Sequence, residues 1–326
     1  MILDPHPLFA ILGPTASGKS ELSIKLCLKL AEEFGIECEI INCDSVQIYR
    51  EMNIGTAKIS KEEMCGIPHH LIDIVEPNES FSAGNFMEHG RRVIFEIRDR
   101  GKIPVLCGGT GFYFRSLVYG IFEGPGGDER IRDRLKHLCD RYGSKRLYRV
   151  LKKVDPIYSR KISENDRNRI IRALEVYFKE GKPISYFHNN FLPESIEGFK
   201  FFFYCLNPPR KMLYKKINDR VEKMFDNGLL DEVKSLLSRY PKNSKGFEAI
   251  GYREVIEFLD GNISLKDAIN LVKKNTRHYA KRQLTWFRKE KDVRFLNFFG
   301  NENKALEEIL EDFKGFYMKE GLTPSH

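Results

Sequence analysis

Short apolar runs alternate with longer amphipathic segments along much of the chain. The apolar runs cover residues 8–12, 37–44, 103–107, 201–206 and 294–296. Each run is short enough to be a buried strand, whereas a buried helix needs a longer one. The segments with helical spacing cover residues 21–34, 210–227, 229–239, 252–259 and 265–289. Strands that alternate with helices predict an α/β fold, in which a parallel sheet carries helices on both faces.

The segment between the second and third of these strands is more polar. Residues 44–50 predict a turn that leads into a helix, and residues 68–73 predict a loop that enters a short strand. Ser82 precedes a further helical pattern and is a typical N-cap residue, because its hydroxyl accepts a backbone N–H of the first turn. We therefore expect a short extra strand and another helix in this part of the chain.

A helical segment interrupts the order of strands and helices between residues 120 and 191. It begins near Gly-Pro-Gly-Gly at 124–127 and ends near Gly-Lys-Pro at 181–183, a composition that is typical of hinged boundaries. The helical patterns inside it cover residues 128–142, 145–154 and 166–179. We predict a small helical domain at residues 121–191, inserted into a core that is formed by residues 1–120 and 192–326.

The first predicted strand leads directly into Gly-Pro-Thr-Ala-Ser-Gly-Lys-Ser at residues 13–20, and a helical pattern follows. This order, with the spacing G-x-x-x-x-G-K-[ST], is that of a phosphate-binding loop, or P-loop. Its glycines let backbone N–H groups turn toward phosphate oxygens, and the helix N-terminus adds partial positive charge. Lys19 adds a full charge, and Ser20 offers a hydroxyl to Mg²⁺. We predict a P-loop NTPase-like core that binds a di- or triphosphate through Gly13, Pro14, Thr15, Ala16, Ser17, Gly18, Lys19 and Ser20.

Asp44 ends the second predicted strand, and the glycine-rich turn 108–111 ends the third. Because the carboxyl ends of parallel strands meet at one edge of the sheet, we expect Asp44 to face the P-loop across a crevice. Two hypotheses fit this aspartate: an anchor for Mg²⁺, as in P-loop NTPases, and a general base. The adjacent glycines Gly108 and Gly109 indicate a close approach of backbone to a ligand.

The net charge of +8 is concentrated in two segments. Residues 130–172 contain fifteen Lys and Arg against five Asp and Glu, and residues 273–291 contain eight against one. Such gathering suggests a polyanion as large as a nucleic acid, although a solvated helix face is the commoner cause of a charge run. Arg220, on the helical segment 210–227, is either such a surface charge or a group that neutralises a leaving phosphate.

The basic segment near the C-terminus also contains aromatic residues at helical spacing. Trp286 and Phe287 are predicted to belong to the core rather than to stack on nucleic-acid bases. Arg277, Lys281 and Arg288 share a helix face and fit contacts with phosphates.

Composition excludes several classes of protein. No apolar run is long enough to span a bilayer, and the N-terminus lacks the pattern of a signal peptide. The seven cysteines are scattered without a C-x-x-C pair, which is typical of reduced thiols in the core of a cytoplasmic protein. We therefore expect a cytoplasmic protein with no membrane partner and no structural zinc.

Ordered motifs along nearly the whole chain make it similar to the tRNA dimethylallyltransferases, also called tRNA isopentenyltransferases, of the bacterial type. Beside the P-loop motif, the resemblance rests on Asp-Ser-Val-Gln-Ile-Tyr-Arg at 44–50, Gly-Thr-Ala-Lys at 55–58, His-His-Leu-Ile-Asp at 69–73, Gly-Gly-Thr-Gly-Phe-Tyr at 108–113, residues 166–176, Gly-Leu at 228–229, Ala-Ile-Gly-Tyr-Arg at 249–253 and residues 279–288. The resemblance implies transfer of a dimethylallyl group from its diphosphate to the exocyclic N6 amine of an adenosine. That adenosine lies just 3′ of the anticodon in tRNAs that read codons beginning with U.

The resemblance also implies roles for individual residues. Asp44 would be the general base, Arg220 and Thr110 would contact the reacting groups together with Lys19, and Ser20 would hold the Mg²⁺ cofactor. The residues that it implies for tRNA binding are Asp44, Ser45, Val46, Gln47, Thr110, Arg132, Asn168, Arg169, Ile170, Ile171, Arg172, Glu248, Ala249, Ile250, Gly251, Tyr252, Arg253, Thr276, Arg277, His278, Tyr279, Ala280, Lys281, Arg282 and Gln283. The expected partners are a tRNA anticodon stem-loop and dimethylallyl diphosphate, bound by a monomer.

The sequence departs from the family pattern at two positions. Asn168 stands where glutamine is usual, which puts one tRNA contact in doubt, and Phe112 stands where leucine is common. Two other functions remain open on the residues alone. A P-loop kinase of a small metabolite or nucleoside would explain residues 8–50 but gives the two basic segments no purpose. A non-catalytic RNA-binding switch driven by nucleotide would leave the carboxylate opposite the P-loop unexplained.

Overall fold

The computed structural model describes residues 4–121 and 124–320, which form a single parallel sheet of six strands together with helices. The strands are β1 His6–Leu12, β2 Cys38–Asn42, β3 His69–His70, β4 Ile103–Gly108, β5 Phe199–Leu206 and β6 Val293–Leu296. Their order is β3-β2-β4-β1-β5-β6, and every neighbouring pair is parallel. All residues of β1, β2 and β4 are buried, as expected for a parallel sheet covered on both faces. The predicted α/β fold is confirmed.

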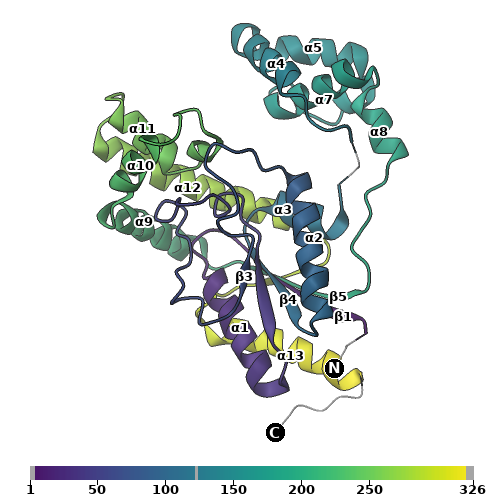
Figure 1. Cartoon of the computed structure of the whole chain (residues 1–326), viewed down its shortest axis with the longest axis vertical. Coiled ribbons are helices and arrows are strands. Elements are labelled where there is room, and N and C mark those ends of the chain that lie inside the picture. The colour runs from purple at the N-terminus through teal and green to yellow at the C-terminus, as the bar shows by residue number, and fades with distance from the viewer. Residues whose placement is uncertain (1–3, 122–123, 321–326) are drawn as a thin grey trace. The chain divides into compact units, whose positions relative to one another are not determined.

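Two pairs of helices cover the faces of the sheet (Figure 1). On one face lie α1 Lys19–Phe34 and α13 Asn303–Lys319, which bury Leu26 and Phe313 against Phe9 of β1. On the other lie α2 Ala83–Asp99 and α3 Gly111–Tyr119, where Phe114 meets Phe203 edge to face at 5.1 Å between ring centroids. Ser82 caps α2 as predicted, since its side chain accepts the N–H of Asn85. The sheet is thus sandwiched, which leaves the ends of its strands free to form a site.

A group of helices follows β5 and lies beyond the carboxyl ends of the strands (Figure 1). These elements are α9 Arg210–Asp226, α10 Leu229–Leu237, the 3₁₀ helix η1 Lys245–Glu248, α11 Tyr252–Leu259 and α12 Leu265–Phe287. Helices α9 and α12 pack on each other through buried Leu213, Ile217 and Ala280. Phe287 is fully buried, as predicted, and Trp286 is half-buried. This contact holds the basic C-terminal segment next to the P-loop side of the sheet.

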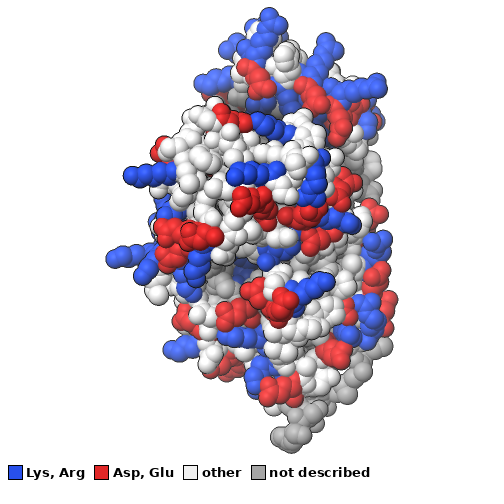
Figure 2. Space-filling model, turned by 60° about the vertical axis from the view of Figure 1, so that its left-hand side comes forward, with Lys and Arg blue, Asp and Glu red and all other residues white. Residues whose placement is uncertain are grey.

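Residues Tyr119–Ser195 form a second compact unit, separate from the one made by the rest of the chain. Its helices are α4 Glu129–Tyr142, α5 Ser144–Val154, α6 Pro156–Ser159, α7 Arg167–Glu180 and α8 Ile184–Asn190. Leu135, Leu151 and Leu174 belong to its small core. Asp128 and Asp166 cap α4 and α7 by accepting backbone N–H groups of the first turn. Lys and Arg side chains crowd the surface of this unit, at the top of the space-filling view (Figure 2).

The structure corrects the expected helix after residues 44–50. Turns occupy this segment, and Tyr49 forms an isolated parallel bridge with Val75. The carboxylate of Asp44 accepts the N–H groups of Val46 and Gln47, which satisfies the backbone locally and competes with a helix. Helices α3, α8 and α13 were not predicted, although α13 has buried apolar residues at regular helical spacing.

Candidate active site

Side chains of the P-loop fold back onto the carbonyl oxygen of Pro14, and the loop ends at the first turn of α1. Gly18 has φ of +90°, a left-handed conformation that other residues rarely adopt. A Cβ at this position would lie 2.9 Å from the backbone nitrogen of Gly300, so the neighbouring chain also requires glycine here. The Ser17 hydroxyl donates to the Pro14 carbonyl at 2.8 Å, and Lys19 Nζ donates to the same oxygen at 2.8 Å. These two hydrogen bonds hold the loop in its turn.

The side chains of Lys19 and Arg220 are two cationic groups of the P-loop region. Burial lowers the pKa of Lys19, whereas the charges of Cys107 and Asp44 oppose that shift. Burial also lowers the pKa of Arg220, against the opposing effect of Asp44. Arg220 Nη1 lies 3.5 Å from the Thr15 hydroxyl, at the outer limit of a hydrogen bond. Partly desolvated cations attract an anion more strongly than exposed ones do, so the P-loop and Arg220 together suit a diphosphate.

Asp44 lies opposite these cations, as expected from its place at the end of β2. Its Oδ1 accepts N–H groups from Val46 at 2.9 Å and Gln47 at 3.4 Å, which fixes the carboxylate plane. Oδ2 has no hydrogen-bond partner within the part of the chain that the structure describes, and Asp44 lines a cavity of about 490 Å³. This oxygen is thus available to accept a proton or to bind a cation.

Tyr279 lines the cavity beside Asp44, and Thr110 lies behind it in contact with Tyr279 and Ser45. The Thr110 hydroxyl oxygen accepts the N–H of Ser45 at 3.0 Å. Burial and the neighbouring Asp44 raise the pKa of Tyr279, while a hydrogen bond with Thr110 acts in the opposite direction. The Tyr279 hydroxyl therefore stays protonated and remains a hydrogen-bond donor near neutral pH.

The glycine-rich turn after β4 is packed against other parts of the protein, which differs from the expected approach to a ligand. A Cβ on Gly108 would lie 2.0 Å from the Cys43 carbonyl oxygen. A Cβ on Gly109 would lie 2.1 Å from Nε2 of Gln283, which donates to the Gly109 carbonyl at 3.0 Å. The Oε1 atom of the same side chain accepts the N–H of Thr15 at 2.9 Å. Gln283 thus ties the P-loop to the turn that carries Thr110.

A loop at the far side of the cavity is held by Glu232, which the sequence analysis did not single out. Its carboxylate accepts the N–H groups of Asn53, Ile54 and Gly55 at distances between 2.7 and 3.1 Å. It also accepts the hydroxyl of Tyr252 at 2.6 Å. No local motif marks this residue, because its partners lie far away in the sequence. The contact positions Gly55 and its neighbour Thr56 on the cavity wall.

The cavity collects many of the residues that the sequence analysis proposed. The predicted site residues that line this cavity are Thr15, Ala16, Asp44, Ser45, Val46, Arg220, Glu248, Ala249, Ile250, Arg253, Thr276, Tyr279 and Arg282. Its volume is in the usual range for small-molecule sites. Other members of the proposed tRNA set are buried in the protein and offer RNA little or no surface. These are Ile170, Ile171, Gly251, Tyr252, Ala280 and Gln283.

In the helical unit, the proposed arginines differ in their surroundings. Glu175 is fully buried and accepts hydrogen bonds from Arg132, with a shortest distance of 3.0 Å. Arg172 lies 3.3 Å from the same carboxylate. Arg169 is exposed, with Asp166 3.5 Å away, and Asn168 is exposed as well. Two of the three arginines therefore support the fold of this unit, whatever they contact outside it.

The chain is similar to known proteins in sequence and in structure. The model of the IPP transferase family matches residues 47–290, which is most of the chain. The chain belongs to the IPP transferase family. The tRNA dimethylallyltransferase of Carboxydothermus hydrogenoformans is 45% identical to this family member, over 93% of this chain and 95% of the relative. That of Thermoanaerobacter sp. strain X514 is 46% identical, over 92% and 93%. The resemblance seen in the sequence is thus confirmed.

Solved structures support the same assignment for this IPP transferase. The tRNA isopentenylpyrophosphate transferase of Bacillus halodurans has a TM-score of 0.70 and 39% identity, over 97% of this chain and 98% of that one. A eukaryotic dimethylallyltransferase, captured in crystals while acting on tRNA, has a TM-score of 0.76 and 29% identity, over 95% and 77%. The P-loop NTPase-like fold is therefore shared along nearly the whole chain. None of the helices within residues 4–121 and 124–320 is long and apolar enough to cross a membrane.

Proposed function

We propose that the enzyme transfers a dimethylallyl group from dimethylallyl diphosphate to the N6 amine of the adenosine 3′ of the anticodon, in tRNAs that read codons beginning with U. The proposal is carried by one observation: the free oxygen of Asp44 and the cationic group of Arg220 line the same cavity as the P-loop residue Thr15. Family membership supports it, because the relatives are named for this transfer to tRNA. The alternative hypothesis, a P-loop kinase, is not supported by the names of these relatives.

The reaction forms one bond, breaks another and moves one proton. The N6 nitrogen attacks the first carbon of the dimethylallyl group, and the bond from that carbon to the diphosphate oxygen breaks. The leaving diphosphate takes the electron pair, and its charge is balanced by Lys19, Arg220 and the N–H groups of the P-loop. The proton from N6 passes to Oδ2 of Asp44, which has no competing hydrogen bond among the described residues.

The residues of the site fit a magnesium ion. Magnesium prefers oxygen ligands, and Ser20 presents an exposed hydroxyl in the first turn of α1. Ser20 would hold the ion together with diphosphate oxygens, and the ion would supply charge neutralisation there. The Asp44 carboxylate, whose charge acts on the neighbouring Lys19, is a candidate for a second ligand, so its roles as base and as metal anchor are separated by experiment below.

We propose that tRNA is held in part by the inserted helical unit, through exposed basic residues such as Arg169. Extruding a base from the anticodon loop costs a few kcal/mol, which contacts with phosphates can offset. The seven cysteines are all free, and six of them are buried, which suits a reducing cytoplasm. We expect the enzyme to act there as a monomer.

The test of the proposed function uses the full chain with Mg²⁺, unmodified tRNA and dimethylallyl diphosphate. We expect release of diphosphate and the addition of one five-carbon unit to tRNA without ATP. Mass spectrometry of the digested tRNA measures the modified adenosine, and adenosine monophosphate alone should be a poor acceptor. A strict requirement for ATP, or phosphate transferred to a small molecule while tRNA stays unmodified, would contradict the proposal.

A further inference from the structure

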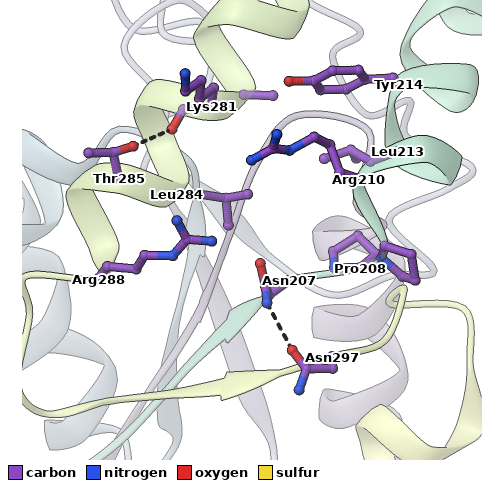
Figure 3. Close-up of a pocket in the computed structure, with 12 residues that line it drawn as sticks. Asn207, Pro208, Arg210, Leu213, Tyr214, Lys281, Leu284, Thr285, Arg288 and Asn297 are labelled. Atoms are coloured by element: carbon purple, nitrogen blue, oxygen red, sulfur yellow. Dashed lines mark hydrogen bonds between the residues drawn. The ribbon is translucent and has the colours of Figure 1, made fainter.

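A second cavity of about 420 Å³ lies between the first turns of α9 and the last turns of α12 (Figure 3). It shares no lining residue with the cavity that contains Asp44. The residues that line it are Asn207, Pro208, Pro209, Arg210, Leu213, Tyr214, Ala280, Lys281, Leu284, Thr285, Arg288 and Asn297. Its α12 residues lie in the motif at 279–288, and Lys281 belongs to the implied tRNA set. None of the motifs includes its α9 residues or Asn297, so the combination needs a separate explanation.

The charged residues of the second cavity are all cations. Arg210, Lys281 and Arg288 line it, and no carboxylate does. None of the three forms an ion pair in the part of the chain that the structure describes, whereas Lys273, also on α12, is paired with Glu222 at 2.5 Å. Figure 3 shows Arg210 and Arg288 extending from opposite sides toward Leu284. All three side chains are exposed, so water screens much of their mutual repulsion, and an anion held between them would relieve the remainder.

The remaining wall of the second cavity is largely apolar. Leu213, Leu284 and the ring of Tyr214 face it, together with two prolines. The only amide pair, Asn207 and Asn297, is already joined by a hydrogen bond of 2.8 Å. A bare phosphate of a nucleic-acid backbone needs no apolar wall, because its neighbours are sugars in solvent. The walls therefore suit a ligand that carries a phosphate on a small apolar or aromatic body.

A layer of buried side chains separates the second cavity from the catalytic one. Leu213 and Ala280 face the second cavity, and Ile217 lies one turn further along α9 and faces the first. Arg220 follows on the same helix, and Tyr279 precedes Ala280 on α12. A ligand in the second cavity would contact the same two helices that place Arg220 and Tyr279 beside Asp44.

From this arrangement we propose that the second cavity binds a small organic phosphate at a site distinct from the P-loop. Arg210 and Arg288 bind the phosphate oxygens, and Lys281 adds its charge at the margin. Leu213, Leu284 and Tyr214 contact the organic part. Occupation of the site would alter how α9 and α12 hold the catalytic groups.

The test uses phenyl phosphate, which carries one phosphate on one aromatic ring, and calorimetry on the full chain. We expect saturable binding to the wild type that persists in Lys19→Ala, whose P-loop has lost its charge. Arg210→Ala and Arg288→Ala should each weaken that binding about tenfold, as expected for the loss of a charge-assisted hydrogen bond. Lys289→Ala is the matched control, because Lys289 is exposed, adjacent to Arg288 and outside the cavity. Inorganic phosphate should bind more weakly than phenyl phosphate, since it leaves the apolar wall in contact with water.

Three results would overturn the proposal. The first is the absence of saturable binding by phenyl phosphate. The second is binding that Lys19→Ala abolishes and the two arginine variants leave unchanged, which would place the ligand at the P-loop. The third is a loss of tRNA affinity in Arg210→Ala and Arg288→Ala without any binding of phenyl phosphate, which would assign the cavity to RNA. Prenyl transfer by the wild type is measured separately, so failure here leaves the proposed function intact.

Discussion

Both units hold buried carboxylates with arginines, but only the sheet unit also gathers charged residues around the cavity that contains Asp44. In the sheet unit, Asp44 and Arg220 line an internal cavity, where burial lowers the pKa of Arg220. In the helical unit, most charges face solvent, and the buried carboxylate of Glu175 is held by Arg132 and Arg172. The difference shows that a basic segment of sequence mixes two kinds of arginine. Arg132 and Arg172 hold the fold together, whereas the exposed Arg169 has no buried carboxylate to hold.

The largest effect is expected in the sheet unit, from Asp44→Asn. The amide cannot accept the proton of the attacking amine, so the rate should fall about 10²- to 10⁴-fold, while tRNA and diphosphate binding persist. Single-turnover kinetics and separate binding measurements test this. Asp219→Asn, an exposed neighbour of Arg220, serves as the control. Turnover within a few-fold of wild type would remove Asp44 as the base, and loss of Mg²⁺-dependent diphosphate binding would make it a metal anchor.

The next largest effect concerns the helical unit alone. Glu175→Gln leaves two arginines around a neutral amide, and we expect a loss of about 1–3 kcal/mol from the stability of this unit. The figure is below that for a fully buried pair because the Arg132 and Arg172 side chains are 39% and 33% exposed. Hydrogen exchange on the full chain should show weaker protection of α4 and α7 and unchanged protection of β1 and β4. Equal weakening in both units would mean that the two do not unfold independently.

A smaller effect is expected from Gln283→Leu, which tests whether the link between the P-loop and the turn that carries Thr110 shapes the site of the sheet unit. Leucine keeps the volume but leaves the Thr15 N–H and the Gly109 carbonyl without their partner, at a cost of about 1–3 kcal/mol. Because the P-loop loses its link to the turn that carries Thr110, we expect weaker diphosphate binding and a lower kcat together. Lys274→Ala, exposed on the same helix, is the control. Unchanged diphosphate affinity would show that the P-loop holds its shape without Gln283.

The smallest effect is expected from Arg169→Ala. Loss of one phosphate contact should weaken tRNA binding and reduce the slope of its salt dependence by about one unit, with diphosphate affinity unchanged. Arg132→Ala and Arg172→Ala should show the same change if these residues also meet tRNA, but they will in addition loosen the helical unit. Arg160→Ala, exposed in that unit and outside the implied tRNA set, is the control. If the salt dependence of tRNA binding is unchanged in all three variants, the basic cluster is a solvated surface that does not contact tRNA.

The parts of the site that could be predicted from the sequence are those formed by residues close together in the chain. The P-loop and its helix follow from spacing within residues 13–20, and the place of Asp44 follows from its position at a strand end. Gln283 could not be found in this way, because the chain positions of its P-loop partner and its own differ by 268. The same holds for Glu232, whose partners Asn53 to Gly55 lie 177 to 179 positions away in the chain. For Gly108 and Gly109 the sequence indicated a close approach, and the structure shows that the approaching groups belong to the protein.

The exclusion of buried residues from the implied tRNA set has the same cause. A motif marks a stretch of chain, but a helix turns its residues in all directions, so Ile170 and Ile171 face the core while Arg169 faces solvent. Burial of one face in every helix is a property of the folded protein, and a motif alone does not separate the two faces.

The pairing of β1 with β5 sets an order of events on the ribosome. His6 pairs with Phe199, and the whole helical unit is synthesised between the two strands. At about 5–20 residues per second, β1 waits about 10–40 seconds for this neighbour. During that time its apolar edge next to β5 is open, while the helical unit has local contacts and can fold first. The insertion thus delays closure of the sheet, and a chaperone that shields the edge of β1 should raise the yield of folded enzyme.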